Sequence, residues 1–385
     1  GMAAPPASSA QTSRFSRVGD SFGANPAWLA CFDGPASSID LDGRDALDAA
    51  ITHFSGSYAR MSQATAVGVT AAWPLAGAPS PLDAELASHT PAFVLLGYGA
   101  NDMVQQGTSN HAASLPAYAK NMATLVDDVL ARGVVPVLFT TPPLAFTATS
   151  LHWVPSFNAV VRAIAESRAV PLVDMYPRVL TLPNYGASGD MLHANVFSGG
   201  ACVLTDVGLS RRTNVRNLLA LQALARLKRA LIDTASDAGL DNDIGALPPG
   251  TLRTGAGTAA APYVIDGSTL PFTDARSTAD STERRVARYD SCGSTSNEGG
   301  PEVWYRLQLA AATRVRVFAQ SVSGDMDIHV LRGAVTTDTD CVARNDKLLD
   351  GELAAGTYTI VVDTYVNASG ERVGHYVLGV HACAA

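Results

Sequence analysis

A serine, a histidine and an aspartate stand where they could form a nucleophilic triad. Ser21 closes a Gly-Asp-Ser run, residues 19–21, directly after a short apolar stretch, and His193 has Asp190 three positions before it. In such a triad the carboxylate orients the imidazole, the imidazole takes the serine proton, and the serine attacks an acyl carbonyl. A serine at a strand end is more often a helix cap, so the first run alone is weak evidence.

A second polar group, residues 99–102 (Gly-Ala-Asn-Asp), follows another apolar run. The Asn101 side chain could donate a hydrogen bond to the oxyanion that develops when a serine attacks a carbonyl. A turn is the alternative interpretation, because Gly and Asn both favour turns. Among the eight histidines, only His193 combines a glycine-rich loop with an aspartate three positions earlier. The joint order of these groups is therefore a stronger signal than any one of them.

Four short, unbroken apolar runs are typical of strands that are buried on both faces, which indicates a parallel sheet. They cover residues 15–18, 93–96, 134–140 and 170–174. Helical periodicity separates the last three, and a long helix is predicted over 214–234, so the pattern is that of an α/β layered domain. Ligands bind beyond the C-terminal ends of strands in such sheets, where Ser21 and Asn101 fall.

The motifs resemble those of the SGNH/GDSL hydrolase family. The matching blocks are Gly19-Asp20-Ser21, Gly99-x-Asn101-Asp102 and Asp190-x-x-His193. The resemblance implies a flavodoxin-like three-layer α/β/α fold with a parallel sheet. It also implies Ser21 as nucleophile, His193 as base and Asp190 as the acid that orients it. The oxyanion would be bound by the Ser21 backbone N–H, the Asn101 amide and a glycine N–H from a further block.

The glycine of this further block is assigned to Gly68, within residues 62–70, and Gly56 is the alternative. The Asn-x-Gly form that the family usually shows is absent from residues 62–70. The resemblance covers roughly residues 14–235, with long insertions around the matching blocks.

The pattern changes after a stretch rich in Gly, Pro and Ala. Short segments then alternate apolar and polar residues without a helical pattern, which is typical of an antiparallel β-sandwich. The expected strands are residues 303–309, 313–319, 327–331, 357–363 and 375–380. We therefore predict a hydrolase domain over residues 14–235, a linker over 236–261 and a β-sandwich domain over 262–385.

The last domain resembles the bacterial pre-peptidase C-terminal (PPC) family. The resemblance is carried by residues 300–305 (GPEVWY), the Asp325-x-Asp327 pair and residues 355–358 (AGTY). It implies an accessory role, such as solubility, surface attachment or polymer binding. Asp325, Asp327 and Asp363 could hold Ca²⁺ through oxygen ligands, but turn and strand-edge aspartates are the preferred interpretation. We expect no metal and no other cofactor.

The five cysteines show no C-x-x-C spacing, which disfavours a zinc or thioredoxin-type site. Their wide spacing favours disulfides in an oxidising compartment, and buried thiols in a cytosolic protein are the alternative. Cys31 follows Ser21 by ten residues and Cys202 follows His193 by nine. If the serine and the histidine meet, the two cysteines come close together, so we predict a disulfide between them.

A second disulfide is expected to join Cys292 to Cys341 in the C-terminal domain. A bond from Cys383 to either of them is the alternative.

Composition excludes several functional classes. Apolar residues make up 47% of the chain, charged residues 16%, and the net charge is −8, so there is no basic field to attract nucleic acid or an anionic membrane. No apolar run approaches the roughly 20 residues that span a bilayer. Gly1 before Met2 is typical of a cleaved tag, so we expect that an export signal was removed and that the protein is extracellular or periplasmic.

These patterns predict a secreted serine esterase that hydrolyses carboxylic esters through an acyl-enzyme. The expected substrate is a small ester or an acylated polysaccharide, and deacetylation of a polysaccharide is the leading specific activity. A lipase or acyl-thioesterase is one alternative, and a surface-binding protein with a vestigial hydrolase domain is another. A metal-dependent hydrolase is disfavoured because no His/Asp cluster has ligand spacing.

Overall fold

The computed structural model describes residues 10–104, 110–235, 253–334 and 337–383, and the chain divides into two compact units. The first unit comprises the described residues up to 114, from 121 to 154 and from 168 to 235. The second comprises residues 115–120 and 155–167 and the described residues from 253 onward. Of the predicted linker, residues 236–252 lie outside the described part of the chain.

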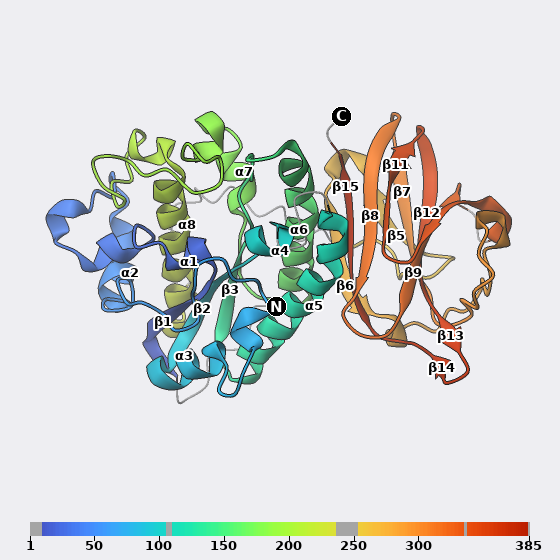
Figure 1. Ribbon diagram of the computed structural model, residues 1–385, viewed down its shortest axis with the longest axis horizontal. Helices are drawn as coiled ribbons and strands as arrows, with labels where there is room; N and C mark the ends of the chain where they lie inside the picture. The colour runs from blue at the N-terminus through green and yellow to red at the C-terminus, as the bar shows by residue number, and fades with distance from the viewer. Residues whose placement is uncertain (1–9, 105–109, 236–252, 335–336, 384–385) are drawn as a thin grey trace. The chain divides into compact units, whose positions relative to one another are not determined.

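The first unit is built on a parallel sheet of four strands in the order β1-β2-β3-β4 (Figure 1). The strands are β1 Gln11–Gly19, β2 Pro91–Gly97, β3 Val135–Phe139 and β4 Leu172–Val173. All of β3 and all of β2 except its last residue are buried. The parallel sheet that the unbroken apolar runs predicted is therefore confirmed.

Helices connect and cover these strands. They are α1 Ser21–Ala24, α2 Asp48–His53, α3 Pro81–His89, α4 Ala100–Val104, α5 His111–Ala131, α6 Ala148–Ser167, α7 Met175–Val179 and α8 Arg212–Leu227. The predicted helix over 214–234 corresponds to α8, which begins two residues earlier and continues as a π-helical turn, Lys228–Ile232. Leu218, Leu221 and Leu224 of α8 share one apolar core with Phe93 and Leu95 of β2.

The second unit contains a five-stranded sheet, β10-β9-β12-β7-β5, a four-stranded sheet, β11-β8-β15-β6, and the two-stranded β13-β14. The strands are β5 Tyr263–Asp266, β6 Phe272–Ser277, β7 Val303–Leu309, β8 Thr313–Ser321, β9 Met326–Arg332, β10 Cys341–Asn345, β11 Leu348–Leu353, β12 Gly356–Thr364, β13 Val366–Asn367, β14 Gly370–Glu371 and β15 His375–Ala382. Antiparallel strands are thus confirmed, with one correction, because β5 pairs with β7 in parallel. Side chains of both large sheets, among them Tyr305, Ile360 and Leu378, form one apolar core.

Two of the three aspartates considered for calcium, Asp327 and Asp363, have side-chain partners within the protein. Asp327 and Asp363 are opposite each other on β9 and β12, and both are buried. Asp327 accepts a hydrogen bond from Arg344 at 2.9 Å, and Asp363 accepts one from the Tyr289 hydroxyl at 2.9 Å. These are buried ladder residues rather than exposed turn residues.

The predicted disulfide of the second unit is present. Cys292 and Cys341 are bonded, with Cα atoms 5.6 Å apart, and Cys383 is unpaired among the described cysteines.

In the part of the chain that the structure describes, no helix has the length and apolar character needed to cross a membrane.

Candidate active site

Ser21 is the first residue of helix α1, at the C-terminal end of strand β1. The strand ends at Gly19, where a Cβ would lie 2.8 Å from the Gly97 carbonyl oxygen, so only glycine allows this close approach. Asp20 caps the helix, and its Oδ1 accepts the Phe22 backbone N–H at 2.9 Å. The Ser21 N–H has no acceptor among the described residues, and it remains available to a ligand.

His193 and Asp190 form a hydrogen-bonded pair in the loop before α8. His193 Nδ1 lies 2.6 Å from Asp190 Oδ2, and Asp190 Oδ1 accepts the backbone N–H groups of Leu192 and His193 at 3.0 and 2.9 Å. Although burial opposes its ionisation, hydrogen bonds from His193 and Leu192 lower the pKa of Asp190 to about 2. Asp190 is thus an anion at neutral pH, and it orients the ring so that Nε2 can accept a proton.

The pair lies beside the nucleophile turn. The His193 ring meets the ring of Phe22, the residue after Ser21, edge to face with 6.1 Å between centroids. Within the described residues, no hydrogen bond joins the Ser21 hydroxyl to His193. Catalytic hydrogen bonds of this kind often tighten only when the substrate binds. The side chains of His193 and Asp190 are 46% and 48% exposed, so a bulky substrate can reach them.

Asn101 reaches the same turn from helix α4. Its Nδ2 donates to Asp20 Oδ2 at 3.1 Å, which leaves the second N–H of the amide for another acceptor. Burial raises the pKa of Asp20 to about 6, although the Phe22 N–H, Arg216 and Asn101 favour the anion. Asp102, next to Asn101, accepts the Ala71 N–H at 3.1 and 3.3 Å, and burial raises the pKa of its carboxyl to about 7.

The segment that contains Gly68 also adjoins β1. Gly19 exchanges two backbone hydrogen bonds with residues 64–66, each 3.2 Å long. Gly68 follows this bridge, is exposed, and has a φ of +77°, which favours glycine. The alternative, Gly56, donates its N–H to Asp33 Oδ1 at 2.7 Å, so that donor is already occupied. The assignment of the third oxyanion donor to Gly68 stays a prediction.

Arg212 supports the loop that contains the pair, and sequence reasoning missed it. This buried side chain of α8 donates to the carbonyl oxygens of Tyr185, Leu192 and Pro143 at 2.8, 3.0 and 3.4 Å. Burial lowers its pKa to about 10, while the charge of Asp190 opposes that change. The guanidinium therefore fixes the backbone on both sides of the loop.

Arg216, one turn further along α8, supports the nucleophile turn. It is buried, donates to the Phe22 carbonyl oxygen at 2.5 Å, and places its guanidinium carbon 3.6 Å from the Trp28 ring centroid. Burial lowers its pKa to about 9, while the charge of Asp20 opposes that change. Two arginines four residues apart on the buried side of a leucine-rich helix are the signal that could have identified both.

A disulfide connects the segments that follow the nucleophile turn and the His193 loop. Cys31 and Cys202 are bonded, with Cα atoms 5.8 Å apart, as the spacing from Ser21 and His193 predicted. Asn217 of α8 ties the same segments, because its Nδ2 donates to the carbonyl oxygens of Ala27 and Ala201 at 3.1 and 2.9 Å. The segment that follows Ser21 and the segment that follows His193 are thereby held together.

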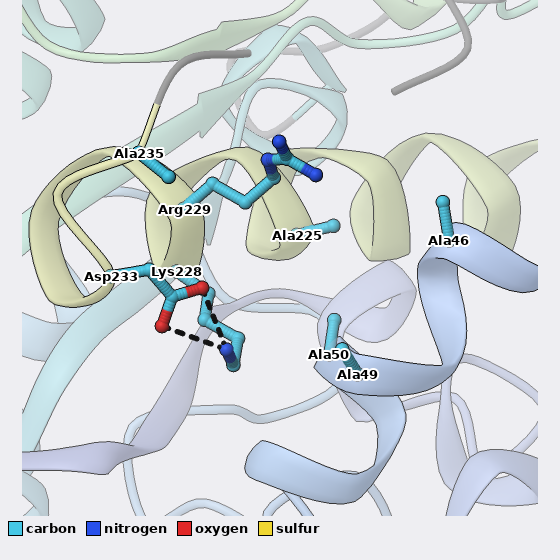
Figure 2. A pocket seen from close by; sticks show the side chains of 8 residues that line it. All are labelled: Ala46, Ala49, Ala50, Ala225, Lys228, Arg229, Asp233 and Ala235. Atoms are coloured by element: carbon cyan, nitrogen blue, oxygen red, sulfur yellow. Dashed lines mark hydrogen bonds and ion pairs between the residues drawn. The ribbon is translucent and has the colours of Figure 1, made fainter. Parts of the chain in front are cut away.

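A hollow of about 240 Å³ lies at the C-terminal end of α8 (Figure 2). It is lined by Ala46, Ala49, Ala50, Ala225, Lys228, Arg229, Asp233 and Ala235. Lys228 is paired with Asp233 at 2.8 Å, and the lining contains none of the predicted site residues. We therefore do not place catalysis there.

Comparison with known proteins gives one family. Residues 18–196 match the model of the GDSL-like Lipase/Acylhydrolase family. A search of curated proteins returned no match. Among solved structures, the chain is similar to a GDSL-like lipase from Bacteroides thetaiotaomicron, with 18% identity, 56% of this chain and 88% of that chain covered, and a TM-score of 0.37. It is also similar to the acetylxylan esterase Axe2 from Geobacillus stearothermophilus, with 15% identity, coverage of 57% and 96%, and a TM-score of 0.39.

Proposed function

Because residues 18–196 form a GDSL-like lipase/acylhydrolase family domain, we propose that this carboxylic-ester hydrolase uses Ser21 as its nucleophile and His193, oriented by Asp190, as its base. The observation that carries the proposal is the 2.6 Å bond between His193 Nδ1 and Asp190 Oδ2, next to the turn that begins at Ser21. The order Ser, Asp, His and the roles of the three side chains follow triad logic.

In the proposed reaction, Ser21 Oγ attacks the ester carbonyl while its proton moves to His193 Nε2. The tetrahedral oxyanion accepts hydrogen bonds from the Ser21 N–H, the second N–H of the Asn101 amide and the Gly68 N–H. His193 then gives the proton to the departing alcohol, which leaves an acyl-serine. A water molecule, deprotonated by His193, attacks the acyl carbon, and the acid leaves as Ser21 regains its proton.

The proposed substrate is a short-chain ester, with acetyl groups on a polysaccharide as the specific candidate. The half-exposed His193 and Asp190 side chains support it, because a polymer alcohol needs open access to the base that protonates it. A lipase or acyl-thioesterase with a lipid-like substrate is the competing function. The two functions differ in how activity depends on acyl length.

The test is a series of p-nitrophenyl esters from C2 to C8, together with an acetylated polysaccharide from which acetate release is measured. We expect the highest kcat/KM at C2, release of acetate, and loss of all activity in Ser21→Ala. Ser38→Ala, which removes an exposed hydroxyl that donates to the Pro35 carbonyl oxygen, is the control and should retain activity. Activity that rises toward C8 without acetate release would favour the lipase function.

We further propose that the first unit is a flavodoxin-like three-layer domain and that the protein is exported. The two disulfides support export, because such bonds persist in oxidising compartments. For the second unit we propose a β-sandwich of PPC type with an accessory role in polymer or surface binding. The apolar core that its two large sheets share supports the sandwich.

A further inference from the structure

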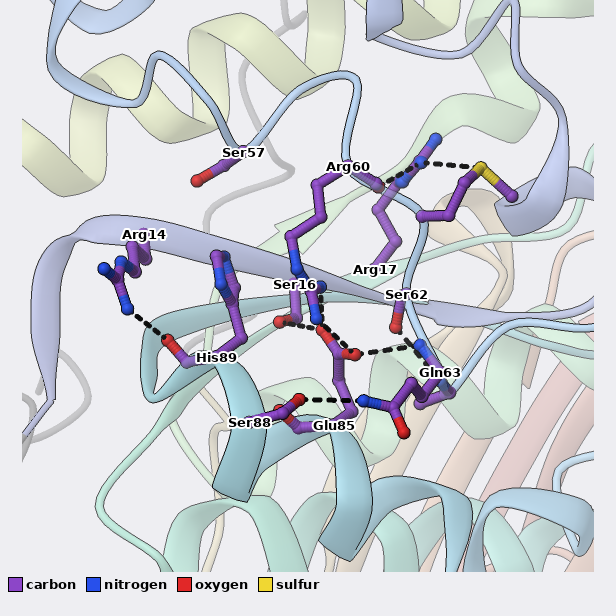
Figure 3. Close-up of polar contacts among 12 residues, drawn as sticks. Arg14, Ser16, Arg17, Ser57, Arg60, Ser62, Gln63, Glu85, Ser88 and His89 are labelled. Atoms are coloured by element: carbon purple, nitrogen blue, oxygen red, sulfur yellow. Dashed lines mark hydrogen bonds and ion pairs between the residues drawn. The ribbon is translucent and has the colours of Figure 1, made fainter.

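Glu85 of α3 is fully buried, and its carboxylate accepts hydrogen bonds from three residues in two separate segments (Figure 3). The donors are the Ser16 hydroxyl of β1, the Arg60 guanidinium, and the Gln63 backbone N–H at 2.8 Å. Although burial opposes ionisation, the bonds from Arg60, Ser16 and Gln63 lower the pKa of Glu85. A buried anion with this many donors holds residues 60–63 at a fixed distance from the strand.

Arg17 holds the same residues from the other face of β1. Its guanidinium donates to the Arg60 carbonyl oxygen at 2.6 Å and to the Trp28 carbonyl oxygen at 3.1 Å. Ser16 and Arg17 are neighbours in a strand, so their side chains point to opposite faces, as Figure 3 shows. Residues 60–63 are therefore tied to both faces of the strand that leads to Ser21.

From this anchor the chain runs directly into residues 64–71, which we call the oxyanion segment. It begins with the two backbone hydrogen bonds to Gly19 and continues through Gly68. It ends at Ala71, whose N–H is bound by Asp102 at 3.1 and 3.3 Å. Two buried carboxylates thus flank the segment, because Glu85 binds Arg60 and Gln63 just before it and Asp102 binds its last residue. Glu85 lies outside every motif block.

We propose that Glu85 is a positioning residue for ester hydrolysis, which fixes the oxyanion segment beside Ser21 by anchoring residues 60–63. The inference rests on the proposed function, because it requires an N–H of this segment to bind the oxyanion. Such donors stabilise the transition state only when they are in place before charge develops. A loosened segment therefore slows the chemical step and leaves ground-state binding nearly unchanged.

The test compares two substitutions of Glu85 with a matched control on the same helix. Glu85→Gln keeps the size and one acceptor for the Gln63 N–H, whereas Glu85→Leu removes every acceptor. The control is Asp83→Asn, because Asp83 is also paired with an arginine, Arg132, and closes the capping box of α3 with Ser80. Its loss lowers helix stability without touching residues 60–63.

For p-nitrophenyl acetate we expect kcat to fall about tenfold in Glu85→Gln and further in Glu85→Leu, with KM within about twofold of the parent. Asp83→Asn should lower the Tm and leave kcat within about twofold. Equal kcat in Glu85→Gln and Asp83→Asn, or a loss confined to KM, would overturn the inference. If Glu85→Leu does not fold, Arg60→Met, which removes the charged donor of Glu85, replaces it with the same expectation. Ser21→Ala is measured alongside, since activity in that variant would contradict the proposed function itself.

Discussion

Asn101 donates its side-chain amide to the buried carboxylate of Asp20, with Nδ2 3.1 Å from Oδ2. The other oxygen of Asp20 takes the Phe22 N–H, so one carboxylate fixes both the nucleophile turn and the amide that faces it. A carboxylate accepts only from the NH₂ group, and this determines which end of the amide points toward Asp20. Two motif blocks that are far apart in the sequence are thus joined through a residue with no assigned catalytic role.

Asn101→Ala should lower kcat by about 10²–10³ while the fold is kept, because it removes one oxyanion donor. Steady-state kinetics with p-nitrophenyl acetate, together with circular dichroism, check this. Asn367→Ala, at the last residue of β13, is the control and should behave like the parent. A kcat within threefold of the parent in Asn101→Ala would remove Asn101 from the proposed oxyanion hole.

Asp20 should make stability depend on pH. Burial raises its folded pKa from the ordinary value of 3.8 to about 6, so the folded state binds this proton more tightly. The stability that it contributes is fully present below pH 3.8 and is lost as pH rises through about 6, a total of about 3 kcal/mol. Arg216, His193 and Asp102 share this environment, so the comparison is made with Asp20→Asn at each pH.

The Tm of the parent relative to Asp20→Asn should therefore fall between pH 4 and pH 7. Scanning calorimetry of both proteins across that range measures it. A difference that stays constant or grows with pH would contradict the raised pKa.

Arg216→Met should lower kcat about tenfold and reduce the free energy of unfolding by about 2–4 kcal/mol, because it removes the bond to the Phe22 carbonyl and the stacking on Trp28. Arg216→Lys should not restore either property, since an ammonium group lacks the planar stacking face. Arg211→Met is the control, because the Arg211 side chain bonds only to Ser210 among the residues that the structure describes. Denaturant unfolding and steady-state kinetics of the three variants check this. If Arg211→Met lost as much stability and kcat as Arg216→Met, the effect would not be specific to Arg216 and the prediction would be contradicted.

The Cys31–Cys202 disulfide spans 171 residues, so its removal should cost about 5 kcal/mol of unfolding free energy on the chain-entropy model. The double variant Cys31→Ser/Cys202→Ser tests this by denaturant unfolding. Cys383→Ser, at the cysteine that has no disulfide partner among the described residues, should leave the free energy within about 0.5 kcal/mol. A non-reducing peptide map with Cys31 and Cys202 as free thiols would contradict the pairing.

The parallel sheet and the ester-hydrolase class could be predicted because their signals are local. Buried parallel strands are unbroken apolar runs, and Ser21, Asn101, Asp190 and His193 stand in short blocks. The catalytic roles of these four residues stay predictions. Their supports could not be found in the same way, because Glu85 and Arg216 act through long-range contacts that leave no motif.

In the second unit, too, the elements without a local sequence signal were not predicted. Strands β7, β8, β9, β12 and β15 alternate clearly and were predicted, whereas β5, β6, β13 and β14 were missed, and so were β10 and β11. These two are edge strands whose residues are mostly exposed or half-buried, so they lack the apolar alternation that identifies a strand. The parallel pairing of β5 with β7 depends on tertiary packing and has no sequence signal.

The central claim is that Ser21 is a nucleophile activated by His193. It is tested most directly by treating the protein with a fluorophosphonate and mapping the adduct by mass spectrometry. The proposal predicts a single adduct on Ser21, with labelling slowed at least about 100-fold in His193→Ala, because the base that removes the serine proton is gone. An adduct on another residue, or equal labelling of Ser21 in the parent and His193→Ala, would contradict it.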